Sequence, residues 1–122
     1  MLRSMRWLFV YGTLMPGRLR WALIADDVVR QRPSAVAGTL YDTGLGYPAL
    51  VLGGDRRVTG WLLGLSQRAP TVLEHLDAVE GPRYRRTEVT TVDGVRALTY
   101  AYIGDSAGFT VLGGPWDRDD ER

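Results

Sequence analysis

Glycine- and proline-containing turns divide this chain into short segments, and this division limits what the chain can fold into. Most of the segments are long enough only for a strand, and they are rich in branched and aromatic residues. Pro33 and Ser34 are expected to break the chain before one strand, and the Gly-Gly-Asp run at 53–55 to form a turn before another. The expected strands are residues 7–11, 36–41, 49–52, 58–65, 84–92 and 95–103.

One segment is predicted to be the main helix, because its apolar residues recur at helical spacing. Pro70 suits the first helical turn, and Gly81 marks the end. The apolar stripe between them consists of Val72, Leu73, Leu76 and Val79. Residues 19–24 are expected to form one or two further helical turns, and Asp93-Gly94 is typical of a type I′ hairpin turn. The fold class is therefore α+β, with mostly strands, one main helix and short helices.

The composition is that of a soluble globular domain. Hydrophobic residues make up 45% of the 122 residues and charged residues 24%, which is the usual range for such domains. A chain of this length buries roughly two-thirds of its unfolded surface, so folding does not require disulfides or metals. We expect a single domain over residues 1–122, in which residues 105–122 form a turn-rich tail with a frayed end.

Several residue types that carry common enzyme chemistry are missing. The chain has no cysteine, lysine or asparagine, and one histidine, His75. These absences exclude thiol nucleophiles, Cys-ligated metals, lysine Schiff bases, lysine-containing phosphate loops and multi-histidine metal sites. His75 lies off the apolar stripe of the helix and is expected in solvent. Proton transfer, if the chain is an enzyme, is left to carboxylates or tyrosines.

Charge and hydropathy bear on partners and location. The formal net charge is +1 and no basic stripe is present, so neither a nucleic acid nor a membrane surface is an expected partner. The apolar run at 7–11 is too short for a signal peptide or a membrane span. We therefore expect a cytoplasmic protein. The choice between monomer and homodimer stays open, as does the start at Met1 or Met5.

The first segment with chemical potential is the exit of the first strand, Tyr11-Gly12-Thr13-Leu14. A strand that runs into a glycine-containing loop leaves backbone N–H groups without strand partners, and such groups can bind a carboxylate or an acyl oxygen. The alternative is an ordinary turn in which Gly12 serves only the backbone.

The second segment is the end of the main helix, where Glu80 follows the apolar stripe. The helix dipole disfavours a negative charge there, and apolar surroundings add to the effect, so the pKa of Glu80 is expected to rise toward the range useful for general acid–base catalysis. The alternative is an exposed glutamate paired with Arg83 or Arg86. Asp77 is either a surface acid or a hydrogen-bond acceptor that stabilises the helix.

Together these segments resemble the gamma-glutamylcyclotransferase-like family, which includes gamma-glutamylamine cyclotransferases. The family pattern is a strand that runs into Tyr-Gly-Ser/Thr-Leu, then Leu-Asp-x-x-Glu-Gly and Tyr-x-Arg. The matching residues are 9–14 (Phe-Val-Tyr-Gly-Thr-Leu), 76–81 (Leu-Asp-Ala-Val-Glu-Gly) and 84–86 (Tyr-Arg-Arg). Tyr47-Pro48, Val58-x-Gly60 and Gly113-Gly114-Pro115-Trp116 match further family positions, so the resemblance spans essentially the whole chain.

The resemblance implies a small mixed β-barrel flanked by one main helix and short helices, with a cavity beside the barrel. It also implies roles for individual residues. Glu80 matches the catalytic acid/base, the loop Tyr11, Gly12, Thr13 and Leu14 matches the substrate-binding loop, and Tyr84 matches a tyrosine near the pocket. One position departs from the family, because Arg20-Trp21 stands where an Asn/His pair is common.

The implied reaction fits the residues that the chain contains. In a gamma-glutamyl amide, the α-amine of the substrate attacks its own γ-carbonyl, which yields 5-oxoproline and a free amine. This chemistry uses proximity and one proton-transfer group, so no cofactor and no metal are expected. The alternative is a non-catalytic small-molecule binding module on the same fold. The sequence leaves the identity of the leaving amine open, including whether the role is metabolic, repair or biosynthetic tailoring.

Overall fold

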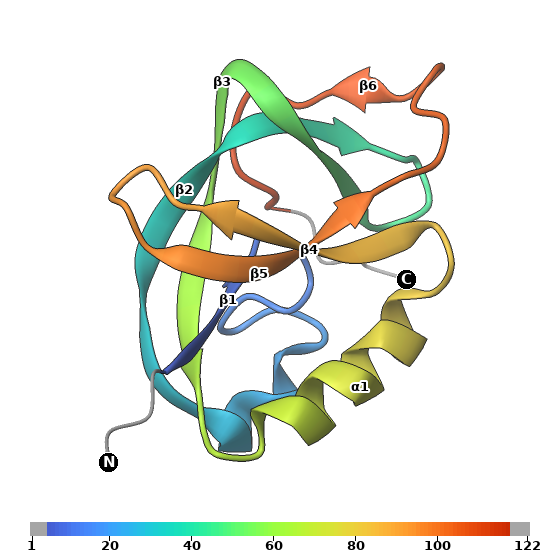
Figure 1. Cartoon of the computed structure of the whole chain (residues 1–122). Coiled ribbons are helices and arrows are strands. Elements are labelled where there is room, and N and C mark those ends of the chain that lie inside the picture. Colours follow the sequence, from blue (N-terminus) through green and yellow to red (C-terminus); the bar gives the residue numbers. More distant parts are fainter. Residues whose placement is uncertain (1–4, 118–122) are drawn as a thin grey trace.

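The computed structural model describes residues 5–117 and contains one six-stranded mixed sheet. The strands lie in the order β4-β5-β1-β3-β2-β6, and a single α-helix lies along one side of the curved sheet (Figure 1). The strands are β1 (Arg6–Val10), β2 (Val28–Asp42), β3 (Pro48–Leu65), β4 (Tyr84–Thr90), β5 (Arg96–Tyr102) and β6 (Thr110–Val111). The helices are α1 (Ala69–Glu80) and the short 3₁₀ turns η1 (Trp21–Leu23) and η2 (Ala25–Asp27).

β1 occupies the middle of the sheet, antiparallel to β3 and parallel to β5. The sheet curls so strongly that the turn after β4 reaches β2, where the Val92 amide donates a 2.9 Å hydrogen bond to the Ala35 carbonyl. Arg32 and Asp93 form an ion pair of 2.9 Å at the same place. The expected mixed β-barrel with one main helix is therefore confirmed, in the form of a half-barrel.

The expected break at Pro33 and Ser34 is wrong, because β2 runs through both residues. Pro33 pairs with Trp61 of β3. Within the described residues β6 pairs with β2 only at Tyr41 and Asp42, so around Pro33 the strand is an edge. Proline is tolerated on an edge strand, where a missing N–H interrupts no second ladder.

The turn expected at 53–55 is an excursion within one strand rather than a boundary between two. Pairing with β2 passes from Arg57 to Leu52, so the residues between them have no partner in that strand. Gly53 and Gly54 have φ angles of +101° and +82°, which are accessible to glycine at little cost. β3 bends sharply here, as the green ribbon in Figure 1 shows.

The type I′ turn expected at Asp93-Gly94 is also wrong. That turn needs a positive φ at both residues, and among the described residues only glycines have one. The Thr91 amide instead donates to the Val95 carbonyl at 2.8 Å, and Gly94 has a φ of +92°. This is a three-residue hairpin loop that ends on a glycine, so Asp93 keeps an ordinary backbone conformation.

The core joins the inner face of the sheet to the helix. Leu73 and Leu76 of α1 are fully buried in one cluster with Leu8 and Phe9 of β1, which confirms most of the predicted apolar stripe. Its last residue, Val79, is half-buried and lines the pocket described below. In the short helical segment, Ile24 is buried whereas Leu19 and Leu23 are exposed. A side chain at Gly60 of β3 would collide with the Val10 carbonyl, so this glycine allows β3 to lie close to the end of β1.

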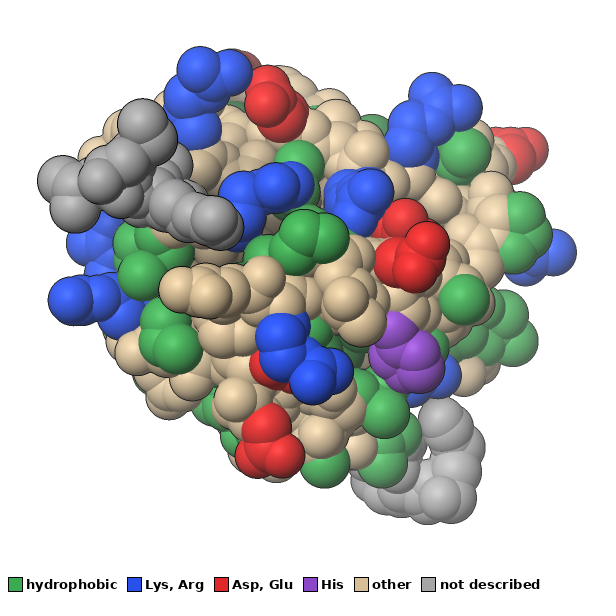
Figure 2. All heavy atoms as spheres, turned by 60° about the horizontal axis from the view of Figure 1, so that its bottom comes forward, with side chains coloured by type: hydrophobic (Ala, Val, Ile, Leu, Met, Phe, Trp, Pro, Cys, Tyr) green, Lys and Arg blue, Asp and Glu red, His purple; other side chains and the backbone are tan. Residues whose placement is uncertain are grey.

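The tail crosses back over the sheet. The Leu112 amide donates a 2.8 Å hydrogen bond to the Leu40 carbonyl, and Trp116 is buried at 2% exposure. The frayed end expected for the tail lies mainly outside the described residues. Over residues 5–117, no helix is long and apolar enough to cross a membrane. On the face shown in Figure 2, arginine side chains alternate with acidic and apolar ones.

Candidate active site

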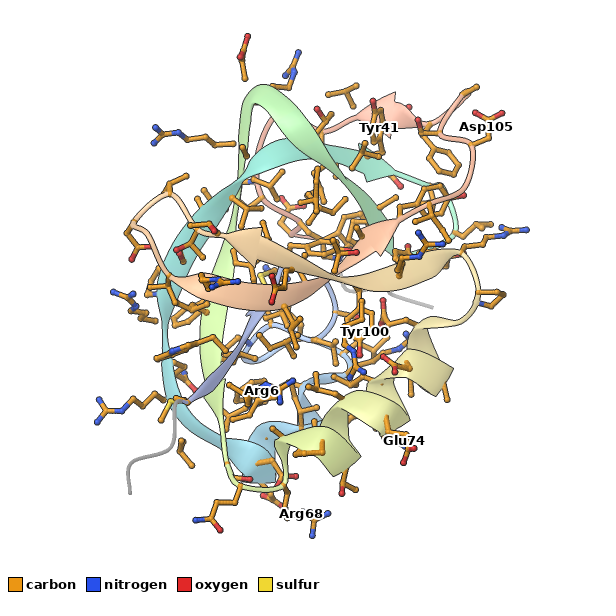
Figure 3. The ribbon with its side chains drawn as sticks, viewed as in Figure 1. Arg6, Tyr41, Arg68, Glu74, Tyr100 and Asp105 are labelled. Carbon is orange, nitrogen blue, oxygen red and sulfur yellow. The ribbon has the colours of Figure 1, made fainter. Side chains whose placement is uncertain are left out.

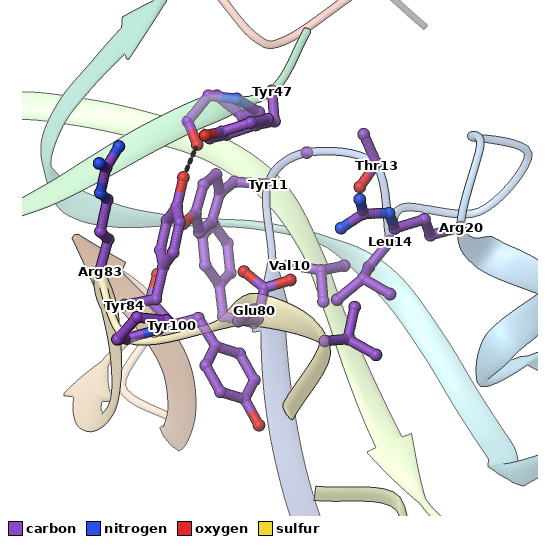
Figure 4. A pocket seen from close by; sticks show the side chains of 15 residues that line it. Val10, Tyr11, Thr13, Leu14, Arg20, Tyr47, Glu80, Arg83, Tyr84 and Tyr100 are labelled. Atoms are coloured by element: carbon purple, nitrogen blue, oxygen red, sulfur yellow. Dashed lines mark hydrogen bonds between the residues drawn. The ribbon is translucent and has the colours of Figure 1, made fainter. Parts of the chain in front are cut away.

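A pocket of about 320 Å³ lies where the end of β1, the end of α1 and the start of β4 meet (Figure 4). All six residues predicted for the site line this pocket, although they come from separate parts of the chain. They are Tyr11, Gly12, Thr13, Leu14, Glu80 and Tyr84. The volume is within the range of small-molecule sites, and the walls combine apolar side chains with a few polar groups.

Glu80 is the last residue of α1, and its carboxylate lies in the middle of the pocket (Figure 4). Gly81 then turns the chain with a φ of +82°, which a residue with a side chain rarely adopts. Burial raises the pKa of Glu80, and the positive charge of Arg20 opposes that rise to a smaller extent. Glu80 is therefore a carboxylate that gains protons more readily than a surface glutamate.

The alternative of an exposed Glu80 paired with Arg83 or Arg86 is wrong. Arg86 lies 3.5 Å from Asp77 instead, and the ion pairs within residues 5–117 do not include Glu80. Asp77 also accepts a 2.7 Å hydrogen bond from the Tyr100 hydroxyl. Asp77 is therefore a tertiary acceptor that ties the turn of α1 before Glu80 to β4 and β5.

The loop after β1 is held through its carbonyls and leaves three of its amides without a partner among the described residues. The Gly12 carbonyl accepts from Met15 at 3.0 Å and the Thr13 carbonyl accepts from Arg20 at 2.8 Å, which fixes the loop. The amides of Gly12, Thr13 and Leu14 donate no hydrogen bond to any other described residue. Three consecutive amides of a pocket-lining loop therefore have no partner among the described residues, and such amides can bind carboxylates or developing oxyanions.

Gly12 has a second role besides backbone geometry. A Cβ at this position would lie 2.8 Å from Cγ of Pro48, which is closer than side chains normally approach. The Pro48 carbonyl accepts a 2.8 Å hydrogen bond from the Tyr84 hydroxyl, so Pro48 is itself held in place. The glycine therefore lets the loop pack directly on this fixed proline.

Three tyrosines of the pocket hold the walls together. The Tyr11 hydroxyl donates to the Tyr100 carbonyl at 2.6 Å, and the Tyr84 ring packs against Tyr47 and Tyr102 at centroid distances of 6.3 and 5.4 Å. Burial raises the pKa of Tyr11, Tyr84 and Tyr100, so these phenols stay neutral at physiological pH. Figure 3 shows Tyr100 between β5 and α1, whereas Glu74 projects outward from the helix.

The sequence interpretation missed several residues of the pocket. Arg20 was noted as a departure from a family pattern and Tyr47-Pro48 as a motif, without a place in the site, yet all three line the pocket. Tyr100 was not singled out at all, and Arg83 was considered only as an ion-pair partner of Glu80. β5 gives no alternation that could have indicated Tyr100, because its last four residues are all buried.

Residues 5–117 contain no group of three or more His, Cys, Asp or Glu side chains arranged to hold a metal ion. The ionisable groups of the pocket are Glu80, Arg20, Arg83 and the tyrosines. A single carboxylate can transfer a proton, and unpaired backbone amides near it can stabilise an oxyanion in the same space.

The fold recurs in solved structures of low sequence identity. An AIG2-like protein from Mus musculus superimposes with a TM-score of 0.69 at 22% identity, over 84% of this chain and 81% of that one. Protein c4763, specific to uropathogenic E. coli, gives a TM-score of 0.71 at 17% identity, over 90% and 89% of the two chains. These likenesses show the fold.

Sequence comparisons identify the family in addition to the fold. The family model for gamma-glutamyl cyclotransferase, AIG2-like, matches residues 8–118. The gamma-L-glutamyl-butirosin B gamma-glutamyl cyclotransferase of Niallia circulans is 35% identical over 113 residues, which cover 93% of this chain and 68% of the relative. The chain therefore belongs to the gamma-glutamyl cyclotransferase, AIG2-like family and is an enzyme of that type.

Proposed function

We propose that the protein converts a gamma-glutamyl amide into 5-oxoproline and a free amine, with Glu80 as the general acid and base. The observation that carries the proposal is the position of Glu80. A carboxylate whose pKa is raised by burial shares one pocket with three backbone amides that have no partner among the described residues. Family membership supports the reaction type.

The reaction is intramolecular. Glu80 accepts a proton from the α-ammonium of the substrate, and the freed amine attacks the γ-carbonyl carbon to close a five-membered ring. The ring nitrogen of the tetrahedral intermediate still carries two protons and gives up one of them. The bond to the leaving amine then breaks, and that amine takes up the proton held by Glu80 together with the one released from the ring nitrogen, so it leaves as an ammonium ion. The new C–N bond of 5-oxoproline replaces the amide bond, so the protein supplies no nucleophile.

A folded substrate conformation is the main requirement of such a ring closure. The extended form of a gamma-glutamyl chain keeps its amine away from its γ-carbonyl, and a confined pocket selects the folded form, which saves much of the entropic cost of the reaction. The tyrosines support this role, because Tyr11 and Tyr84 are held by hydrogen bonds to Tyr100 and Pro48 rather than free to adapt. In this proposal the amides of Gly12, Thr13 and Leu14 hold the glutamyl group.

The leaving amine defines the biological role. The Niallia circulans relative is named as a gamma-glutamyl cyclotransferase of gamma-L-glutamyl-butirosin B, so its name points to a gamma-glutamyl conjugate as its substrate. We infer a small-molecule gamma-glutamyl amide as the substrate class of this chain. Its pocket of about 320 Å³ is within the size range of sites that bind small molecules.

The test is a panel of gamma-glutamyl amines incubated with the purified protein, with 5-oxoproline measured by mass spectrometry. The matched control is the same panel with an acetylated α-amine, which cannot attack the γ-carbonyl. The proposal expects 5-oxoproline from free-amine substrates and none from the acetylated ones. Absence of 5-oxoproline from every substrate of the panel would contradict it.

A further inference from the structure

Arg20 is the charged pocket residue for which the mechanism above has no use. Its backbone amide donates to the Thr13 carbonyl at 2.8 Å, so the residue is fixed to the loop after β1. Its side chain is half-buried and lines the pocket. In Figure 4 the guanidinium extends from the side of Thr13 and Leu14 toward the Glu80 carboxylate.

Arg20 and Glu80 face one another without forming a direct contact. No nitrogen of Arg20 lies within 4.0 Å of a Glu80 oxygen, and Arg20 takes part in no ion pair within residues 5–117. The two charges nevertheless interact across the pocket, because Arg20 lowers the pKa of Glu80 and of Tyr84. The space between them is thus bounded by one negative and one positive group.

Such a space is complementary to the head group of an α-amino acid, which carries an ammonium and a carboxylate on one carbon. We propose that Arg20 binds the α-carboxylate of the gamma-glutamyl group while Glu80 receives its α-ammonium. This inference rests on the proposed function, since it concerns the substrate of the same site. A guanidinium offers two parallel N–H donors, which match the two oxygens of a carboxylate.

Arg83 is a weaker candidate for this role. It also lines the pocket, but its side chain is exposed, and in Figure 4 it lies on the other side of Tyr84 from Glu80. Arg83 is also absent from the charges that shift the pKa of Glu80. The α-ammonium and α-carboxylate are separated by only one carbon, so the partner of the carboxylate has to be near Glu80.

The assignment has a consequence for the loop amides. If Arg20 holds the α-carboxylate, the amides of Gly12, Thr13 and Leu14 are available for the γ-carbonyl oxygen, where negative charge develops as the ring closes. The head group would then be fixed by two side chains and the reacting carbonyl by backbone. This arrangement selects L-glutamyl substrates by their α-carboxylate rather than by their leaving amine.

The experiment compares two substrates that differ only in that carboxylate. One is gamma-glutamyl anilide, which yields 5-oxoproline, and the other is 4-aminobutanoyl anilide, which lacks the α-carboxylate and yields 2-pyrrolidinone. Both substrates release aniline, so one assay gives kcat/KM for each of them. If the turnover of 4-aminobutanoyl anilide is too slow to measure, its inhibition constant against gamma-glutamyl anilide is measured instead. Wild type is compared with Arg20→Gln, Arg20→Lys and the exposed control Arg57→Gln, each checked for folding by circular dichroism.

We expect Arg20→Gln to lower kcat/KM for gamma-glutamyl anilide roughly tenfold to a hundredfold, as for a lost charge-assisted hydrogen bond. The value for 4-aminobutanoyl anilide should change far less, Arg20→Lys should recover part of the loss, and Arg57→Gln should behave as wild type. A changed pKa of Glu80 would alter kcat/KM for both substrates by the same factor, so this effect cancels in the ratio of the two kcat/KM values.

Equal loss for both substrates in Arg20→Gln would overturn the inference. A third substrate, gamma-glutamyl-4-aminobenzoate, carries an additional carboxylate on its leaving side, and a loss of kcat/KM in Arg20→Gln that is confined to this substrate would also overturn the inference. These results differ from a failure of the proposed function, in which wild type releases no 5-oxoproline from gamma-glutamyl anilide.

Discussion

The Tyr100 hydroxyl on β5 donates a 2.7 Å hydrogen bond to Asp77, which lies one helical turn before Glu80 on α1. The same hydroxyl lies 3.1 Å from the Leu73 carbonyl, and Asp77 also contacts Arg86 at 3.5 Å. The end of the helix is therefore tied to the sheet immediately before the residue proposed for proton transfer. Tyr100 and Asp77 are positioning residues in this account.

The first prediction concerns that tie. Tyr100→Phe removes the hydroxyl and leaves the ring, so we expect the free energy of unfolding to fall by about 1–3 kcal/mol and kcat to fall more than KM changes. Urea denaturation and steady-state kinetics measure the two effects. Tyr102→Phe is the matched control, since its hydroxyl donates no hydrogen bond to another described residue. Similar behaviour of the two variants would contradict the role of the Tyr100 hydroxyl.

The second prediction is a pH profile. Glu80 must be ionised to accept the proton, and burial raises its pKa above the usual value of 4.5. We therefore expect kcat/KM to rise with pH through a midpoint above 4.5. Because Arg20 lowers the pKa of Glu80, the midpoint should move upward in Arg20→Gln. An unchanged midpoint in this variant would show that Glu80 does not control the rise of kcat/KM with pH.

The third prediction concerns stability. A carboxyl whose folded pKa is raised stabilises the fold below its unfolded pKa, and this contribution is lost as pH rises through the folded pKa. Glu80→Gln keeps the shape without the charge, so its free energy of unfolding relative to wild type should increase from acidic to neutral pH. Denaturation at several pH values tests this, with the exposed Glu74→Gln as control. A relative stability that decreases over the same range would contradict the direction of the shift.

The fourth prediction concerns the loop after β1. A Cβ at Gly12 would lie 2.8 Å from Cγ of Pro48, so Gly12→Ala must displace the loop. We expect a loss of about 1–3 kcal/mol in stability and a fall in kcat/KM, because the amides move away from the substrate. In Gly113→Ala the added Cβ meets nothing within 4 Å, so that variant should behave as wild type. Unchanged kinetics in Gly12→Ala would argue against a role for the loop amides.

The helix and most strands could be predicted from the sequence, because their apolar patterns directly reflect one buried face. The errors came from local signals that tertiary contacts override. Pro33 is accommodated because β2 is an edge at that point, and Gly53-Gly54 bends a strand that continues beyond it. Asp93-Gly94 was assigned the commonest hairpin turn for that pair, but the loop has three residues. None of these outcomes follows from neighbouring residues alone.

Only part of the candidate site could be predicted from the sequence. Glu80 could be identified because the helix dipole disfavours a negative charge at a helix C-terminus, so a glutamate directly after the apolar stripe suggests a function. The partners of that glutamate are distant in sequence, and only the fold brings Arg20 and Tyr100 to the same pocket. Charge facing charge across a cavity leaves no local pattern in a sequence.

The most direct test of the account is 5-oxoproline release by Glu80→Gln, measured beside wild type and Glu74→Gln. The substrate is the best gamma-glutamyl amine of the panel, at the pH of maximal wild-type activity. General acid–base groups typically contribute 10²–10⁴-fold, so we expect the rate of Glu80→Gln to fall by at least about 100-fold while Glu74→Gln stays near wild type. A folded Glu80→Gln variant that releases 5-oxoproline at close to the wild-type rate would contradict the proposed mechanism.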